Sequence, residues 1–287
     1  MIKRFNVMQE ERHQLLLLVQ DIRQDHPTMG VRDIYYKLNP AHIGRDAFER
    51  LCRNWDLMIK KERNYSRTTD SSGVVRFDNL IENLTLTHID QVWQSDITYY
   101  LLHGKFYYLT FILDAFSRRI LGYRASKRLY TEDTTLPALQ QAIAARKNTI
   151  LKGLIFHSDG GGQYYDDKFL QLTKKYAMKN SMCEYAWENG KAERINGVIK
   201  NNYLKYRKIN SYADLIKELD RSVQLYNKEK PHIALQRKSP VTFENEILHL
   251  HQQTKLKMTK SLNANNQILG ASSPKKSEQT QLQNQNV

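Results

Sequence analysis

Apolar positions recur with helical spacing in three segments near the N-terminus. The first segment, residues 9–25, has Leu15, Leu16, Val19 and Ile22 on one face, and the pattern ends before Pro27. A second helix is expected over Val31–Leu38 and a third over Gly44–Trp55. The third helix directs one set of side chains inward, Phe48, Leu51 and Cys52, and another set outward, Arg45, Arg50 and Arg53.

Three short helices with tight turns and a basic last helix are typical of a helix-turn-helix domain, which contacts DNA. We therefore expect residues 1–64 to form a small all-α DNA-binding domain, with Arg45, Arg50 and Arg53 as the DNA-contacting residues. The pattern also fits a helical bundle whose arginines are merely solvated. These residues alone leave both interpretations open.

A polar stretch without apolar periodicity follows, and we expect a linker over residues 65–87. Beyond it, the pattern changes to strands, of which the first three form an antiparallel meander joined by short turns. Helices then alternate with two more strands. The expected strands are Gln91–Tyr100, Lys105–Asp114, Arg119–Ala125, Gly153–His157 and Lys179–Cys183, and the expected helices are Thr131–Arg146, Asp167–Tyr176, Glu188–Lys205 and Tyr212–Tyr226.

This order of elements predicts an α/β core over residues 88–248, with a mixed five-stranded sheet and helices on both faces. One more short helix should begin after Ser239-Pro240 and close this domain. Residues 249–287 are rich in Gln, Asn, Ser and Lys and have little to bury, so we expect a disordered tail.

The 287 residues carry a formal net charge of +14, which favours a polyanionic partner such as nucleic acid. A merely basic protein remains possible, and an anionic membrane surface is disfavoured because no strongly amphipathic basic helix is present. No apolar run approaches the length of a membrane span, and the N-terminus lacks the pattern of a signal peptide. We expect a cytoplasmic, nucleoid-associated protein. Cys52 and Cys183 should be buried thiols rather than a disulfide or zinc site.

Two aspartates occupy positions that suggest a catalytic or metal-binding role. Asp96 lies in the middle of an apolar strand, where an unpaired carboxylate is costly to bury, so a positive group should lie beside it. Asp159 follows a strand and precedes three glycines, at the kind of strand end where ligands collect. Carboxylates suit Mg²⁺, and two such ions can assist an in-line phosphoryl transfer. Either aspartate taken alone is more often a cap or a salt-bridge partner.

Several ordered motifs carry a resemblance to a known family. The chain resembles, over most of residues 9–248, the second-reading-frame (OrfB) product of insertion-sequence transposases of the IS-three-like family, which have an integrase-type DDE catalytic core. Their core is matched by QVWQSDITY (91–99), LDAFSRRILG (113–122), HSDGGGQY (157–164) and ENGKAERINGVIK (188–200). The closing motif matches at Tyr226-Asn227, Pro231-His232, Leu235 and Ser239-Pro240, and the helix-turn-helix at Met29–Arg32 and Arg50-Leu51.

The resemblance implies an RNase H-like fold in which Asp96, Asp159 and Glu193 bind two Mg²⁺ or Mn²⁺ ions and catalyse DNA cleavage and strand transfer. It also implies that Lys200, two helical turns after Glu193, meets a DNA phosphate; a solvated surface lysine is the alternative. The implied partners are insertion-sequence ends and target DNA, a second copy of the chain on DNA, and an upstream-frame protein or fusion.

The chain departs from the family at two places: the spacing between Asp159 and Glu193 is slightly short, and Gly160 stands where a polar residue is common. The shortening falls in a loop before the Glu193 helix, so it should not displace the carboxylate. Three neighbouring residues receive non-catalytic interpretations. These are Asp114 as an acceptor for Arg118 or a backbone amide, Glu188 as an acid at a helix start, and His157 as a hydrogen-bonding residue rather than a ligand.

Two other functions compete with a transposase. An RNase H-like nuclease acting on RNA or branched DNA would not need the N-terminal helical domain or the basic closing segment, and both are present. A DNA-binding regulator that retains the fold without chemistry would be favoured by a missing carboxylate, and none is missing.

Overall fold

The computed structural model describes residues 2–59, 77–147, 151–250 and 252–253. The expectation of a linker falls partly, at residues 65–76, outside the described residues. The expectation of a disordered tail lies outside them from residue 254 onward. Both stay predictions.

Three helices form the N-terminal part, α1 (Ile2–Asp25), α2 (Val31–Leu38) and α3 (Arg45–Asn54). The helix α1 begins seven residues earlier than expected, because nothing in residues 2–8 breaks a helix even though the apolar period starts later. Extended glycines, Gly30 and Gly44, precede α2 and α3 and set the two turns. The shared core consists of Val19, Met29, Val31, Ile34, Phe48 and Cys52.

A five-stranded mixed sheet forms the centre of the second part, as expected. Its order is β3-β2-β1-β4-β5; β1, β2 and β3 run antiparallel, whereas β4 is parallel to β1 and β5 is parallel to β4. The strands are β1 (Val92–Leu102), β2 (Lys105–Asp114), β3 (Ile120–Ser126), β4 (Ile155–Ser158) and β5 (Lys179–Met182).

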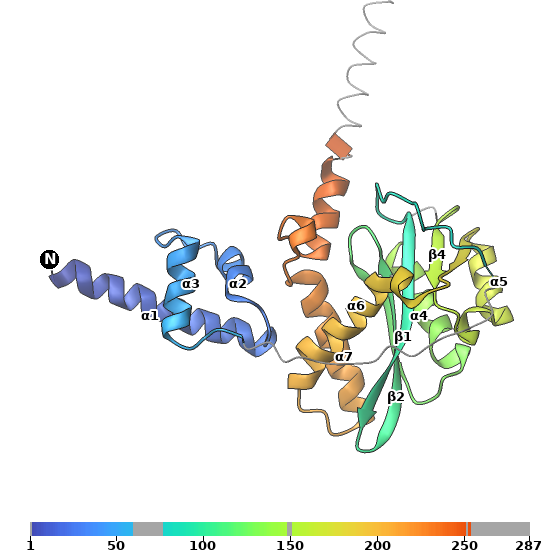
Figure 1. The fold of residues 1–287 in the computed structure, drawn as a ribbon, viewed down its shortest axis with the longest axis horizontal. Helices are drawn as coiled ribbons and strands as arrows, with labels where there is room; N and C mark the ends of the chain where they lie inside the picture. The colour runs from blue at the N-terminus through green and yellow to red at the C-terminus, as the bar shows by residue number, and fades with distance from the viewer. Residues whose placement is uncertain (1, 60–76, 148–150, 251, 254–287) are drawn as a thin grey trace, which may run out of the picture. The chain divides into compact units, whose positions relative to one another are not determined.

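Helices cover both faces of this sheet, which confirms the predicted layering (Figure 1). Along β2, Phe111 packs with the α6 and α7 side while its neighbour Ile112 packs with the α4 and α5 side, as the two-residue period of a strand requires. The four helices are α4 (Thr135–Ala145), α5 (Asp167–Lys175), α6 (Gly190–Val198) and α7 (Tyr212–Lys228).

Two predicted helices are interrupted. The segment expected over Thr131–Arg146 starts as a 3-10 turn, and α4 begins only after Thr134, because an unbroken helix would place the Pro137 ring against the carbonyl of Asp133. The segment expected over Glu188–Lys205 contains α6 followed by a π-helical turn, Ile199–Tyr203. Such a turn widens the helix locally and is decided by packing rather than by apolar spacing.

A close approach of β3 and α4 fixes one side of the core. A Cβ atom added at Gly122 would lie 2.0 Å from the carbonyl oxygen of Ala138, so only glycine fits between the strand and the helix. Cys52 and Cys183 are buried free thiols, as expected. Among the described residues, no helix has both the length and the apolar content needed to cross a membrane.

Candidate active site

Asp96 lies in the middle of β1 and faces α6. Its partner across the antiparallel pair is Phe111, which belongs to the core on the α6 and α7 side, so the half-buried carboxylate points to the same face. Its Oδ1 accepts a hydrogen bond from the backbone amide of Ile97 at 2.9 Å. Burial, followed by the charge of Asp159, raises the pKa of Asp96 to about 7.

Asp159 lies beside Asp96 on the neighbouring strand. The parallel pairing of β1 and β4 matches Gln94 with His157, so two residues further along each strand come Asp96 and Asp159. Asp159 is the first residue after β4, and its Oδ1 accepts a hydrogen bond from the amide of Gly161 at 3.2 Å. Burial raises the pKa of Asp159 above its ordinary value.

Glu193 lies in the first turn of α6, the helix that packs over β1 and β2. Burial raises its pKa, and its charge adds to that of Asp159 in raising the pKa of Asp96. The three predicted carboxylates therefore lie close enough to interact through their charges, since the charges of Asp159 and Glu193 both raise the pKa of Asp96. Within the part of the chain that the structure describes, no three His, Cys, Asp or Glu side chains converge closely enough to enclose an ion.

Asn196 joins α6 to the central strand and was not anticipated from the sequence. Its Nδ2 donates a hydrogen bond to Oδ2 of Asp96 at 2.6 Å. Asn196 lies one turn after Glu193, so a single helix face supplies both the third carboxylate and the donor that orients the first. The spacing from Glu193 indicates the shared helix face, but the contact with Asp96 depends on how α6 packs on β1.

Lys200 extends back to β1. Its Nζ donates hydrogen bonds to Oγ1 of Thr98 at 2.6 Å and to the carbonyl oxygen of Tyr99 at 3.2 Å. Burial lowers the pKa of Lys200, while the charge of Asp96 opposes that change. Lys200 is thus a positive group beside Asp96, as the buried carboxylate required.

The three neighbouring polar residues have structural contacts. Asp114 accepts hydrogen bonds from the backbone amides of Asp90, Phe116 and Ser117, so of the two acceptor roles considered, the backbone one is observed. Glu188 accepts from the amides of Glu184 and Tyr185 ahead of α6.

His157 is fully buried, and its Nδ1 is 3.0 Å from Oγ of Ser181. Burial lowers the pKa of His157 to about 4, which keeps the ring neutral. This contact fits the expected hydrogen-bonding role.

A group of cations, two of which flank Glu193 on α6, was also missed. The pKa of His232 is lowered to about 3, first by burial and then by the charges of Lys230, Arg118 and Arg194. The pKa of Lys191 is lowered by burial and by the charge of Arg118. None of these four basic side chains forms a salt bridge to a described residue. We call Arg118, Lys191, Arg194 and Lys230 the basic cluster.

The three predicted DNA-contacting arginines lie on α3. Arg45 pairs with Asp46 at 2.8 Å and Arg53 with Glu49 at 3.2 Å, whereas exposed Arg50 forms no salt bridge to a described residue.

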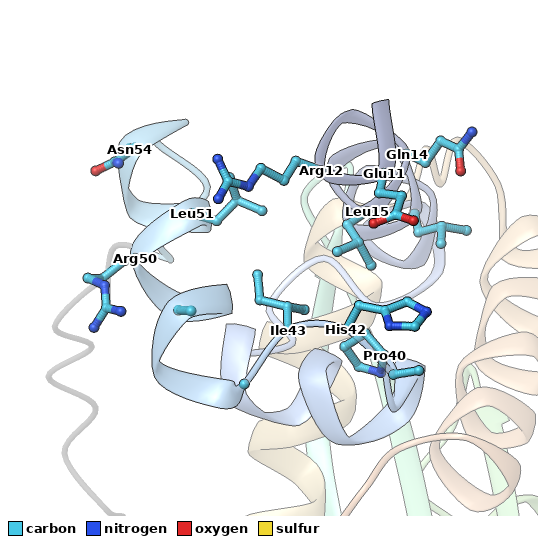
Figure 2. Close-up of a pocket in the computed structure, with 14 residues that line it drawn as sticks. Glu11, Arg12, Gln14, Leu15, Pro40, His42, Ile43, Arg50, Leu51 and Asn54 are labelled. Carbon is cyan, nitrogen blue, oxygen red and sulfur yellow. The ribbon is translucent and has the colours of Figure 1, made fainter. Parts of the chain in front are cut away.

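Figure 2 shows Arg50 at the edge of a groove of about 620 Å³ between α1 and α3. Leu51, expected in the core, instead lines this groove with Leu15 and Ile43, while Phe48 and Cys52 are buried as expected.

Two models of the integrase core domain match the chain, over residues 87–186 and 176–240. An uncharacterised 31 kDa protein of insertion element IS600 from Shigella sonnei is 30% identical over 244 residues, which is 83% of this chain and 88% of that protein. The transposase for IS629 of Shigella sonnei is 29% identical, over 62% of this chain and 60% of that protein. The transposase InsF for IS3A of Escherichia coli K12 is 27% identical, over 68% of this chain and 69% of that protein.

Among solved structures, a chain of the simian T-cell lymphotropic virus intasome in complex with the PP2A regulatory subunit B56 gamma matches with a TM-score of 0.50 and 15% identity. The match covers 79% of this chain and 72% of that chain. This likeness concerns the fold and confirms the expected RNase H-like architecture.

The chain belongs to the family of insertion-sequence transposases that have an integrase core domain. The predicted family is therefore confirmed. The match to IS600 spans most of both proteins, but the chain covers less than two thirds of the length of the IS629 transposase.

Proposed function

We propose that this protein cuts and rejoins DNA strands during transposition, with Asp96, Asp159 and Glu193 as the catalytic carboxylates. The observation that carries the proposal is the position of Asp96, a desolvated carboxylate whose pKa is raised by burial and by the charges of the other two acids. The fold holds these like charges near one another, which costs free energy. A bound cation would offset that repulsion, so the arrangement favours a cation site.

A hard divalent cation suits the chemistry of these residues, because all three donors are carboxylate oxygens and a bound cation would offset their repulsion. Binding would have to draw the three side chains closer together than they lie in the described residues. When bound, Mg²⁺ or Mn²⁺ supplies Lewis-acid polarisation of the phosphate that is attacked. The proposal includes two ions, which Asp96, Asp159 and Glu193 would hold between them. Asn196 orients Asp96 through the hydrogen bond to its Oδ2.

DNA is the proposed substrate, and the cations of the chain provide its contacts. Lys200 is held beside Asp96, where its ammonium can meet a phosphate next to the reacting one. The basic cluster forms no salt bridge to a described residue, although the charges of Asp114 and Asp33 act on Lys191 and Lys230, and it is proposed to provide further positive charge beside α6. In the N-terminal part, the helix α3 with Arg45, Arg50 and Arg53 is proposed to bind the terminal repeat as a helix-turn-helix.

The experiment that tests this function uses the full chain, Mg²⁺ and a labelled duplex that carries the ends of the insertion sequence. We expect a nicked end and a joined product, both of which disappear with EDTA. An RNase H-like nuclease would yield hydrolysed strands without joining. A non-catalytic regulator would bind the duplex and leave it intact. Either of these last two outcomes would overturn the proposal.

A further inference from the structure

The loop between β5 and α6 presents two stacked aromatic rings to solvent. The ring centroids of Tyr185 and Trp187 are 4.4 Å apart and their planes differ by 4°. Trp187 is 73% exposed, the highest fraction for any aromatic side chain among the described residues, and Tyr185 is 47% exposed. Since Tyr185 covers one face of the indole, the exposure of Trp187 comes from its other face. We call this pair the aromatic shelf.

Two contacts fix the loop beside the acidic site. The amide of Cys183 donates to the carbonyl oxygen of Ser158, the residue before Asp159, at 3.0 Å. Buried Asn189 donates from Nδ2 to the carbonyl oxygen of Ser95, the residue before Asp96, at 2.8 Å. The loop is therefore tied at both ends to the strands that carry the two aspartates.

The loop backbone is also fixed between those ends. Glu188 Oε2 accepts hydrogen bonds from the amides of Glu184 at 2.7 Å and Tyr185 at 3.0 Å. The shelf is thus held in place before any ligand arrives, which reduces the entropy lost on binding.

The chemistry of the shelf selects a flat, neutral ligand. A free indole face stacks well on a nucleobase and equally on any of the four bases. A phosphate is disfavoured, because the Glu188 carboxylate lies at the backbone of Tyr185 and brings negative charge next to the shelf. A base inside a duplex has both faces covered by its neighbours, so it can stack on the shelf only when it is unpaired and leaves the helix.

We propose that the aromatic shelf binds one unpaired base of the DNA strand next to the bond that is cut or joined. This inference rests on the proposed function for its substrate. Stacking there would hold the end of the strand open and its backbone close to the carboxylates. The shelf would act by positioning the strand, because among the described residues neither ring forms a hydrogen bond to Asp96, Asp159 or Glu193.

The test uses the full chain with Asp159→Asn, so that the DNA stays intact and binding is measured apart from chemistry. The probe is a terminal duplex with one unpaired 5-iododeoxyuridine beside the cleavage position, compared with its fully paired counterpart. We expect a photo-cross-link to Tyr185 or Trp187, and tighter binding of the unpaired probe by roughly tenfold. Added Trp187→Ala should abolish both the cross-link and the preference, and Trp187→Phe should retain part of them.

Phe106→Ala is the matched control, because Phe106 is also an exposed aromatic that packs against a tyrosine, Tyr99, but lies in the β1–β2 hairpin. It should leave the cross-link and the preference unchanged. The proposal is overturned if Trp187→Ala keeps the preference for the unpaired base, or if it changes only the sedimentation of the protein, which would make the shelf a contact between chains. A wild-type chain that fails to join strands but shows the cross-link would refute the proposed function and leave the shelf supported.

Discussion

Lys200 is bound to Thr98, two residues beyond Asp96 on the same strand. The hydrogen bond from its Nζ to Oγ1 of Thr98 is 2.6 Å long. Because side chains two apart on a strand share a face, this contact places the ammonium on the face that carries Asp96. The π-helical turn that contains Lys200 does not carry the side chain away from β1.

Lys200→Ala should therefore weaken DNA binding and slow strand joining, since it removes one phosphate contact and no metal ligand. The slope of log affinity against log salt should become shallower by about one unit. Thr98→Val is the control, because it removes the hydroxyl that accepts the hydrogen bond from Lys200 and keeps the charge of Lys200. A wild-type salt series for Lys200→Ala, with wild-type joining, would show that Lys200 is an ordinary surface lysine.

Arg50 should contribute more to binding of the terminal repeat than Arg53. Arg53 must give up its salt bridge with Glu49 to meet a phosphate, whereas Arg50 forms no salt bridge to a described residue and only its charge acts on Asp46. Titration of terminal DNA at several salt concentrations should show a larger loss of affinity for Arg50→Ala than for Arg53→Ala, with salt weakening both steeply. A fragment lacking residues 1–64 that binds its repeat with unchanged affinity and salt slope would contradict the role of this domain.

Gly122→Ala should destabilise the catalytic domain. The new Cβ would overlap the carbonyl oxygen of Ala138, and overpacking of this kind costs about 1–3 kcal/mol. Gly197→Ala in α6 is the matched control. A Cβ there meets only Asn201 Nδ2, at 3.9 Å, so higher helix propensity should add up to about 1 kcal/mol. Equal unfolding midpoints in urea for the two variants would contradict the close approach of β3 and α4.

Glu244 should make the fold sensitive to acid. It is 1% exposed and accepts hydrogen bonds from Arg146 at 2.6 and 2.8 Å and from Arg119 at 2.7 Å. Burial alone would raise the pKa of Glu244, but the hydrogen bonds and charge of Arg146, with Ser117 and Arg119, lower it overall. A lowered folded-state pKa gives stability that is present above the unfolded value of 4.5 and lost as the pH falls through the folded value.

Glu244→Gln should lower the free energy of unfolding by about 3 kcal/mol at pH 7, because it leaves the Arg146 charge buried with less compensation. The difference from wild type should shrink as the pH falls below 4.5. Glu132→Gln, which alters only the exposed pair with Lys168, is the control. A difference that grows in acid would contradict the lowered pKa.

The sequence located Asp96 and Asp159 because a carboxylate within or directly after an apolar strand conflicts with burial and so requires a reason. Residue patterns could not separate Glu193 from Glu188, since both stand near the start of one helix; the family resemblance made that choice. Asn196 and the basic cluster were missed because polar residues on a helix or at a turn look solvated until the partner strand is known. The π-helical turn after α6 likewise depends on packing that apolar spacing does not encode.

The most direct test of the central claim is the rate of strand joining in Mg²⁺ by Asp96→Asn, Asp159→Asn and Glu193→Gln, measured against wild type. Each replacement keeps the size of the side chain and removes a charged ligand, so all three should lose joining without losing affinity for terminal DNA or the wild-type unfolding midpoint. Glu132→Gln should join strands as the wild type does. Joining at a rate near that of the wild type by any one of the three variants would contradict the assignment of the catalytic carboxylates.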